Sequence, residues 1–418
     1  MANRFEYFMK ATITLLIGRL LQHRKIIFIL MVMLILARFS FLIIYNWNNG
    51  NTGKPGVQYL TDSYRYIEAA DKLIANEPLD YKEIQYTGYI VIIAFFRLFS
   101  DNLIGVVFLQ VIMALAAAWA LYKISFAITK KPLSGIIAAG LYLMNPFIVS
   151  WHNYIMTESM YTSFLILSTW LLISAVEKKS DITIVFSLLL VLITACIRPN
   201  GWTLIPVALC FYFMHWFHKN YQKLIWVFSV ALVFIICISF LPFTNRSIQN
   251  IGTEKILMNE VLLNGEVIPD HKELRIKMPA DTTLMKKNWT AGFYYVIRHP
   301  LPCAKLGIYR IATELFQIRR PWYSAKYYLR SFLWLFPAYI FAMIGLFYYR
   351  KKISIKIILT IILVHILTIA VTFADHDARF LNYFLPLINI LSGCGITFVM
   401  DKIALSGRLP VKPEPNLK

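Results

Sequence analysis

Charged residues are scarce in this sequence, and acidic residues are the scarcer kind. Only 15% of the 418 residues are charged, and 22 acidic residues stand against 42 basic ones, for a net charge of +20. A soluble domain of this size does not need a chain that is 58% hydrophobic, so a purely soluble protein is excluded. The basic excess by itself would suit a nucleic-acid partner. We exclude that partner because the cations flank apolar runs, as positive-inside topology requires.

Several motifs are absent as well. The five cysteines show no paired spacing and mostly lie in apolar runs, which indicates small buried side chains rather than disulfides or a metal set: Cys196, Cys210, Cys237, Cys303 and Cys394. No glycine-rich phosphate loop is present, so nothing supports a nucleotide-powered mechanism. No small-residue cleavage site follows the first apolar run, and we expect that run to be an uncleaved helix.

Repeated apolar runs are what the sequence has in abundance. Runs of about 17–25 residues predict an all-α polytopic membrane protein, because a bilayer core of about 30 Å needs roughly 20 residues of helix. We predict ten transmembrane helices, at residues 26–45, 103–128, 132–150, 157–176, 182–197, 203–217, 224–242, 331–349, 353–372 and 380–400. With this set every short inner loop is basic, while the short outer loops hold only Arg198 and Arg379. Both termini are then cytoplasmic, in an inner (plasma) membrane protein.

Three further helices are predicted to lie along the membrane rather than across it. Residues 9–21 form an amphipathic helix on the cytoplasmic surface, and residues 86–99 form a juxtamembrane or re-entrant helix that is too short to span. Residues 301–316 form an amphipathic helix on the outer leaflet. The predicted regions are a cytoplasmic N-terminus (1–25), a transmembrane catalytic module (26–242) with an external loop (46–102), an external or interfacial loop region (243–330), C-terminal transmembrane helices (331–400) and a cytoplasmic tail (401–418).

Unusual polar residues converge on the outer face in this topology. Each has a structural alternative, since Asp62 or Glu158 could only cap a helix and Arg198 could only anchor an interface. Four separate short segments nevertheless place carboxylates and cations on one face, and such residues are functional candidates. The candidates are Asp62, Arg65, Tyr66, His152, Tyr154, Glu158, Arg198, His376, Asp377 and Arg379.

This set suits sugar transfer from a lipid carrier. A carboxylate near a sugar hydroxyl can accept its proton as that oxygen attacks an anomeric carbon. A phosphate leaving group needs cations, and arginine offers a planar fork of donors. A lipid-linked donor explains why the candidate residues lie at a membrane boundary.

The same residues resemble the GT-C membrane glycosyltransferases. The chain looks closest to the branch with the aminoarabinose transferases of lipid A and the protein O-mannosyltransferases, and it is similar to glycosyltransferase family 39. The segment Asp62-Ser63-Tyr64-Arg65-Tyr66 resembles the acidic first-loop motif of the family. Further similarities lie at Thr87-Gly88-Tyr89, Asn145-Pro146, Met156-Thr157-Glu158-Ser159, Arg198-Pro199, Ile297-Arg298-His299-Pro300 and Asp377-Ala378-Arg379-Phe380 with Pro386.

The resemblance implies a function and a set of roles. The enzyme would move a sugar from a polyprenyl-phosphate donor to a lipid, glycan or protein acceptor on the periplasmic face, with inversion. Asp62 would be the catalytic carboxylate, Arg379 with Arg65 or His376 would contact the donor phosphate, and Glu158 would position the acceptor or orient a cation. Tyr66 would belong to the substrate site.

The sequence also departs from the family pattern. Ser63 stands where the motif often has Glu, which weakens any role that needs two adjacent carboxylates, including metal binding. We therefore predict no metal site, and a divalent metal stays open as a cofactor. Ile84 or Gln85 replaces the lysine of the aminoarabinose transferases, with Lys82 only nearby, which argues against lipid A as the acceptor.

Two alternatives remain. An O-antigen ligase or polymerase would also have a long outer loop with Arg and His, and Arg298 and His299 would then matter most. A transporter of lipid-linked sugars is the weakest reading, because we see no repeat between the halves and the charges lie at one face rather than at the midplane.

Overall fold

The structure is a computed structural model that describes residues 57–216 except 179, 260–281 except 270 and 272, 289–317, 323–375 and 379–406, with isolated positions 29, 33, 36 and 40. These ranges are helical, and their extended pairing is limited to isolated bridges between Gln58 and Tyr154 and between Glu266 and Arg275. The predicted helices at 9–21 and 224–242 lie outside the described residues, as does most of 26–45.

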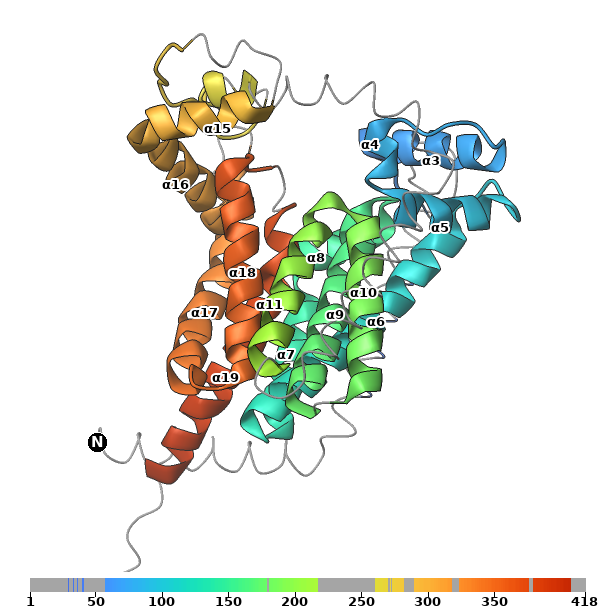
Figure 1. Cartoon of the computed structure of the whole chain (residues 1–418). Helices are drawn as coiled ribbons and strands as arrows, with labels where there is room; N and C mark the ends of the chain where they lie inside the picture. The colour runs from blue at the N-terminus through green and yellow to red at the C-terminus, as the bar shows by residue number, and fades with distance from the viewer. Residues whose placement is uncertain are drawn as a thin grey trace, which may run out of the picture.

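Long apolar helices form the body of the molecule (Figure 1). Five are long and apolar enough to cross a membrane: α6 (Ile104–Thr129), α9 (Thr157–Lys178), α17 (Ala325–Tyr349), α18 (Ile353–Val371) and α19 (Leu381–Ser406). A sixth span is obtained if α7 (Pro132–Met144) and the segment that follows it are counted together. The protein is therefore a polytopic, helical membrane protein, and the predicted total of ten spans stays a prediction.

The segment predicted as one helix over 132–150 is broken in the structure. It consists of α7, then α8 (Pro146–Val149) and the 3₁₀ helix η1 (Ser150–Asn153), with a bend of 52° between the two parts. Asn145 has an extended backbone, and its side chain accepts a hydrogen bond from the Phe147 N–H at 2.9 Å. An Asn cap followed by Pro146 at the first helical position starts a new helix, so the bend follows from two adjacent residues.

The remaining described helices are shorter. They are α3 (Thr61–Ile74), α4 (Tyr81–Ile84), α5 (Thr87–Arg97), α10 (Asp181–Ile197), η2 (Pro199–Thr203), α11 (Leu204–Trp216), α15 (Trp289–Arg298) and α16 (Pro300–Phe316). The predicted helices at 86–99 and 301–316 correspond to α5 and α16. Arg97 of α5 holds Asp71 of α3 with two hydrogen bonds, at 2.9 and 3.0 Å, so α3 and α5 form one unit. This unit lies at the top of the bundle in Figure 1.

The helices α17 and α19 pack so closely that side chains are excluded between them. A Cβ atom added to Gly345 would collide with the carbonyl of Leu391, and one added to Gly395 would collide with that of Phe341. Small residues at such a crossing let two membrane helices approach at the backbone. Because α19 follows directly on Arg379, this contact fixes the helix that leads out of the site described next.

Candidate active site

The first turn of α3 carries Asp62. The Ser63 hydroxyl accepts a hydrogen bond from the Leu60 N–H at 2.9 Å, which closes the N-terminus of the helix. Ser63 is fully buried, so the residue that departs from the acidic motif acts here as a cap. The Asp62 side chain stays 31% exposed, and a carboxylate is favoured at this end of a helix.

Backbone pairing brings the start of α3 beside the start of α9. The Gln58 N–H donates to the Asn153 carbonyl at 3.2 Å, and the Gln58 carbonyl accepts from the Ile155 N–H at 3.1 Å. The buried Gln110 amide donates to the carbonyls of His152 and Tyr154, at 2.8 and 3.0 Å. These bonds hold the turn before α9, and Glu158 is the second residue of that helix.

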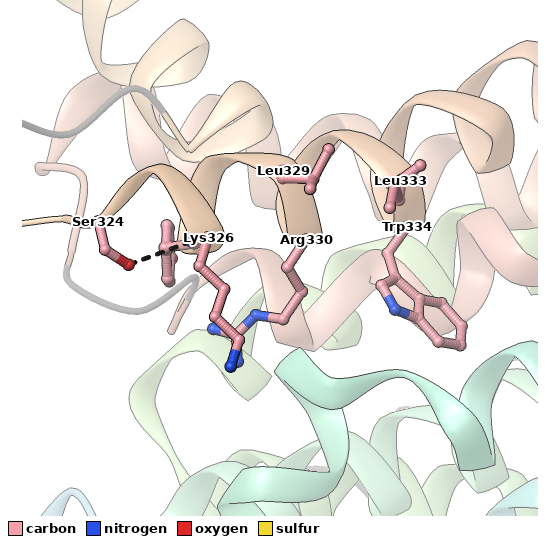
Figure 2. Close-up of a pocket in the computed structure, with 7 residues that line it drawn as sticks. Ser324, Lys326, Leu329, Arg330, Leu333 and Trp334 are labelled. Carbon is pink, nitrogen blue, oxygen red and sulfur yellow. Dashed lines mark hydrogen bonds between the residues drawn. The ribbon is translucent and has the colours of Figure 1, made fainter.

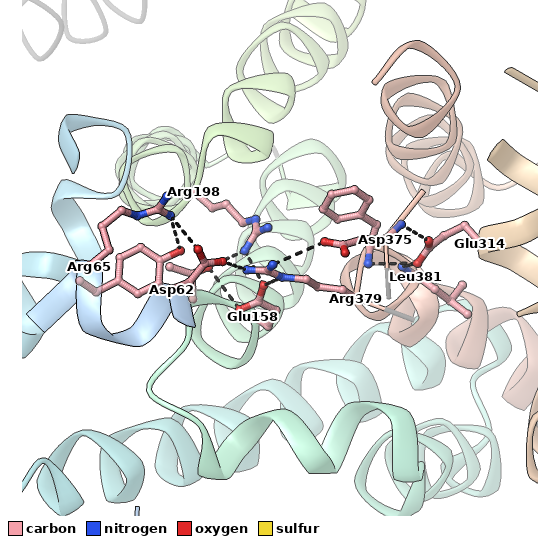
Figure 3. Close-up of polar contacts among 11 residues, drawn as sticks. Asp62, Arg65, Glu158, Arg198, Glu314, Asp375, Arg379 and Leu381 are labelled. Carbon is pink, nitrogen blue, oxygen red and sulfur yellow. Dashed lines mark hydrogen bonds and ion pairs between the residues drawn. The ribbon is translucent and has the colours of Figure 1, made fainter. Parts of the chain in front are cut away.

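Arg379 meets both carboxylates from the other side (Figure 3). Its Nη2 donates to Asp62 Oδ2 at 2.8 Å, its Nε donates to Glu158, and its Nη1 lies 3.5 Å from an oxygen of Asp375. Burial by itself would lower the pKa of Arg379, but Glu158 and the other nearby acids raise it well above the ordinary value. Arg379 is therefore a permanent cation held among three acids.

Glu158 is the buried centre of this arrangement. Its carboxylate has no exposed surface and also accepts a hydrogen bond from Arg198 Nη1 at 2.7 Å. Arg198 additionally lies over the ring of Tyr383, with 4.9 Å between the guanidinium and the centroid. A charge buried this deeply needs partners, and Glu158 has two arginines.

We call the six charged residues Asp62, Arg65, Glu158, Arg198, Asp375 and Arg379 the polar cluster. Three of them are cations and three are acids, so the cluster as described is electrically balanced. Arg65 lies 3.5 Å from Asp62 and over the rings of Tyr66 and Tyr86, at 5.2 and 5.4 Å. Within the described ranges, no three His, Cys, Asp or Glu side chains are grouped as metal ligands would be.

Tyr66 is a buried aromatic residue that contacts Arg65. It is 1% exposed, and its ring packs against those of Tyr86 and Tyr89, with centroids 5.2 and 5.5 Å apart. Burial raises the pKa of Tyr66, so its phenol stays neutral and accepts a hydrogen bond from Arg65 at 3.4 Å. Tyr66 thus orients Arg65 next to Asp62.

A carboxylate on α16 holds the backbone around Arg379. Glu314 has no exposed surface, and it accepts hydrogen bonds from the N–H groups of Asp375, Phe380 and Leu381 at 3.0, 3.1 and 2.9 Å. Arg310 on the same helix donates to the carbonyls of Glu266, Ala370 and Val371. Burial lowers the pKa of Arg310 to about 10, so it remains charged at neutral pH. The helix α16 is therefore tied to both ends of the segment that leads to Arg379.

The structure joins most predicted site residues and leaves others apart. Asp62, Arg65, Tyr66, Glu158, Arg198 and Arg379 come together. Arg298 and His299 instead face Asp281, at 3.7 and 3.2 Å. Their helix, α15, lies at the same end of the bundle as α3 but on its opposite side (Figure 1). His376 and Asp377 lie outside the described residues.

Sequence reasoning missed the residues that support the cluster. Glu314 lies in the helix predicted as amphipathic at 301–316, and an acid among apolar residues at helical spacing is a signal of a buried partner. Gln110 gave a similar signal, since it is a polar residue inside a long apolar helix. Neither signal identifies the partner. The backbone groups that bond to the Glu314 carboxylate lie at least 61 residues away, and the carbonyls that accept from Gln110 lie at least 42 residues away.

Comparison with known proteins finds one family similarity, which covers part of the chain. The model of the dolichyl-phosphate-mannose-protein mannosyltransferase family matches residues 87–243, which include Glu158 and Arg198. No curated protein matches the chain. The family match, the apolar helices and the resemblance of the separate motifs agree with one another. The chain is a membrane glycosyltransferase that uses a polyprenyl-phosphate-linked sugar, and its residues 87–243 match this family.

Proposed function

We propose that this enzyme transfers a sugar from a polyprenyl phosphate to an acceptor hydroxyl at the outer face of the membrane, with inversion of the anomeric centre. One observation carries the proposal: Arg379 contacts Asp62, 317 residues away, and Glu158 at once. A phosphate-binding cation and a partly exposed carboxylate are thereby adjacent. These are the two groups that such a transfer requires.

The reaction is a single displacement. The acceptor oxygen forms a bond to the anomeric carbon while the bond from that carbon to the phosphate oxygen breaks. Asp62 takes the proton of the acceptor hydroxyl, and polyprenyl phosphate leaves with the electron pair. Arg379, assisted by Arg65, stabilises the charge that develops on the phosphate.

Binding of the donor phosphate also changes the partners of Asp62, because the cations of the polar cluster are already paired with acids. Arg379 donates to Asp62 at 2.8 Å. A donor phosphate that takes the Nη2 group of Arg379 replaces Asp62 as its partner and leaves the Asp62 carboxylate open to the acceptor hydroxyl. Glu158 keeps Arg379 in place during this exchange, because it holds the Nε group and is itself held by Arg198.

We further propose that the cluster faces the periplasm, that both termini are cytoplasmic, and that ten helices span the membrane. Basic residues at the opposite end of the bundle support this orientation. Lys131 pairs with Asp401 there, and Lys352 donates to the Ile128 carbonyl. Cysteine labelling of intact cells at Tyr64 and at Lys351 tests the orientation, since only Tyr64→Cys is expected to react with an impermeant reagent.

The function is tested with the purified full-length protein in lipid vesicles. Polyprenyl phosphates that carry radiolabelled hexoses or pentoses are supplied together with a membrane extract as the source of acceptor. We expect at least one donor to be consumed and its label to move to extract components with the opposite anomeric configuration. Retention of configuration, or no consumption of any such donor, contradicts the proposal.

Arg298→Ala is expected to keep transfer within about twofold of wild type. The Arg298 side chain is 59% exposed and its ion pair with Asp281 is 3.7 Å long, so it contributes little to stability. Transfer rates of Arg298→Ala and Asp62→Asn measured side by side separate the proposed mechanism from that of an O-antigen ligase. Loss of activity in Arg298→Ala together with normal activity in Asp62→Asn would favour the ligase.

Glu314→Gln is expected to lower transfer about tenfold or more, mainly through a higher KM for the donor. Glu314 Oε1 accepts hydrogen bonds from the N–H groups of Phe380 and Leu381, while Oε2 accepts one from the N–H group of Asp375. Glutamine keeps one oxygen but turns an NH₂ group toward one set of N–H donors, and a hydrogen bond to a charged group is worth about 1.5–3 kcal/mol. Glu273→Gln, which changes an exposed acid, is the matched control. Equal donor KM values for the two variants would show that Glu314 does not position Arg379.

A further inference from the structure

The start of α17 lines a cavity of about 420 Å³ that the proposed reaction does not use (Figure 2). The helix begins after Ser324, whose side chain accepts a hydrogen bond from the Tyr327 N–H at 3.3 Å. Lys326, Arg330 and Trp334 follow at intervals of four residues and point to the same side of the helix in Figure 2. Ser324, Tyr327, Leu329 and Leu333 complete the lining.

The cationic side chains of the lining lie toward the start of the helix. Lys326 and Arg330 occupy the first two turns, and Leu333 and Trp334 occupy the third, about 12 Å beyond Lys326 at 1.5 Å per residue. The helix α17 is long and apolar enough to cross the membrane. A groove of this kind offers cations near the headgroup level and an apolar surface deeper in the bilayer, which is the pattern of an anionic amphiphile.

The two cations are held without neutralisation. The guanidinium of Arg330 lies over the rings of Phe147 and Tyr327, 5.0 Å from each centroid. Within the part of the chain that the structure describes, no carboxylate pairs with Lys326 or Arg330. Arginine and lysine together on an apolar wall favour a phosphate group, which a guanidinium binds with two parallel hydrogen bonds.

The groove is connected to the support of the polar cluster through Tyr327 and Gln317. The Tyr327 hydroxyl donates to Gln317 Oε1 at 3.0 Å, and Gln317 donates to the carbonyl of Glu314, the residue that holds the backbone around Arg379. Phe147, which contacts both Arg330 and Tyr327, belongs to the short helix α8 that continues through η1 toward Glu158. The groove is therefore linked by hydrogen bonds to the helix that holds the backbone around Arg379.

We propose that this groove binds the acceptor, and that the acceptor is a membrane lipid with a phosphate-bearing headgroup. The inference rests on the proposed function. There the donor phosphate is held by Arg379, because the bond that breaks must lie beside Asp62. A second cationic groove that runs into the bilayer then serves a second amphiphile. Its phosphate contacts Lys326 and Arg330, its chain lies along Trp334, and its hydroxyl reaches Asp62.

The test compares Lys326→Ala/Arg330→Ala with a control at the other end of the same helix, Arg350→Ala/Lys351→Ala. In the transfer assay with membrane lipid extract, the groove variant is expected to raise the KM for the extract at least tenfold. The donor KM and the slow hydrolysis of the donor without acceptor are expected to stay unchanged. Lys326→Arg/Arg330→Lys, which keeps both charges, is expected to restore most of the activity.

A binding experiment keeps this inference separate from the proposed function. Dioleoyl phosphatidic acid and dioleoyl phosphatidylcholine are titrated into the detergent-solubilised full-length protein, and bound lipid is counted by native mass spectrometry. We expect the groove variant to lose retention of phosphatidic acid relative to wild type, while the control variant keeps it.

Other outcomes would contradict the inference. Unchanged retention of phosphatidic acid together with an unchanged KM for the extract would show a surface that merely faces lipid. A raised donor KM would assign the groove to the donor, and transfer to protein alone would exclude a lipid acceptor. Failure of wild type to use any donor would overturn the proposed function but leave the binding result intact.

Discussion

Asp62→Asn is expected to lower the transfer rate by about 10²–10⁴-fold while the protein folds and binds donor as wild type does. Asparagine has the shape of aspartate, and its oxygen can still accept the hydrogen bond from Arg379 that Asp62 accepts at 2.8 Å. It cannot take a proton from the acceptor hydroxyl, and removal of a general base costs a factor of this size. Because Asp62 is 31% exposed and its Arg65 contact is 3.5 Å long, the loss of its charge has little effect on stability.

The control for this variant lies on the same helix. Asp71→Asn removes the charge of a residue that pairs with Arg97 and takes no part in the polar cluster. We expect Asp71→Asn to transfer sugar within about threefold of wild type. Initial rates at saturating donor, together with thermal unfolding of the purified proteins, distinguish a lost base from a lost fold. Wild-type rates in a well-folded Asp62→Asn enzyme would remove Asp62 from the mechanism.

The helices were largely predictable because each corresponds to a local run of apolar residues. The predicted spans at 103–128, 157–176 and 353–372 correspond to α6, α9 and α18, with ends that differ by at most two residues. The break between α7 and α8 was missed, although the pair Asn145-Pro146 is a local start signal for a helix. The apolar count over residues 132–150 simply outweighed that signal.

The composition of the site was partly predictable, but its contacts were not. Positive-inside reasoning placed Asp62, Glu158, Arg198 and Arg379 on one face, since sidedness depends only on the order of spans and loops. Which arginine contacts which acid depends on how the helices pack. The apolar periodicity of one helix does not show which other helices it packs against. Glu314 shows this limit well. Its three partners are backbone N–H groups, which every residue except proline has. The sequence therefore does not show that Glu314 binds the backbone of Asp375, Phe380 and Leu381.

Glu158→Gln is expected to destabilise the protein by about 3–5 kcal/mol and to abolish measurable transfer. The carboxylate has no exposed surface and lies between Arg198 and Arg379. Removing one member of a buried ion pair leaves an uncompensated charge in a poorly solvated site, which accounts for a loss of this size. Arg379 would also lose the contact that fixes its Nε group, so the donor phosphate would meet a displaced cation.

A second substitution separates charge from shape in this prediction. In Glu158→Gln/Arg198→Gln one cation is removed together with the acid, so we expect part of the lost stability to return, and the two changes to be non-additive. Activity should stay low, because Arg379 is still unsupported.

The control is Glu177→Gln, near the other end of α9. Glu177 accepts a hydrogen bond from the Ser354 hydroxyl and is exposed, so little change in stability is expected. Urea or thermal unfolding in detergent gives the stabilities. A single Glu158→Gln protein as stable as wild type would mean that water reaches Arg198 and Arg379 freely, and the polar cluster would then be an open, solvated surface instead of a packed site.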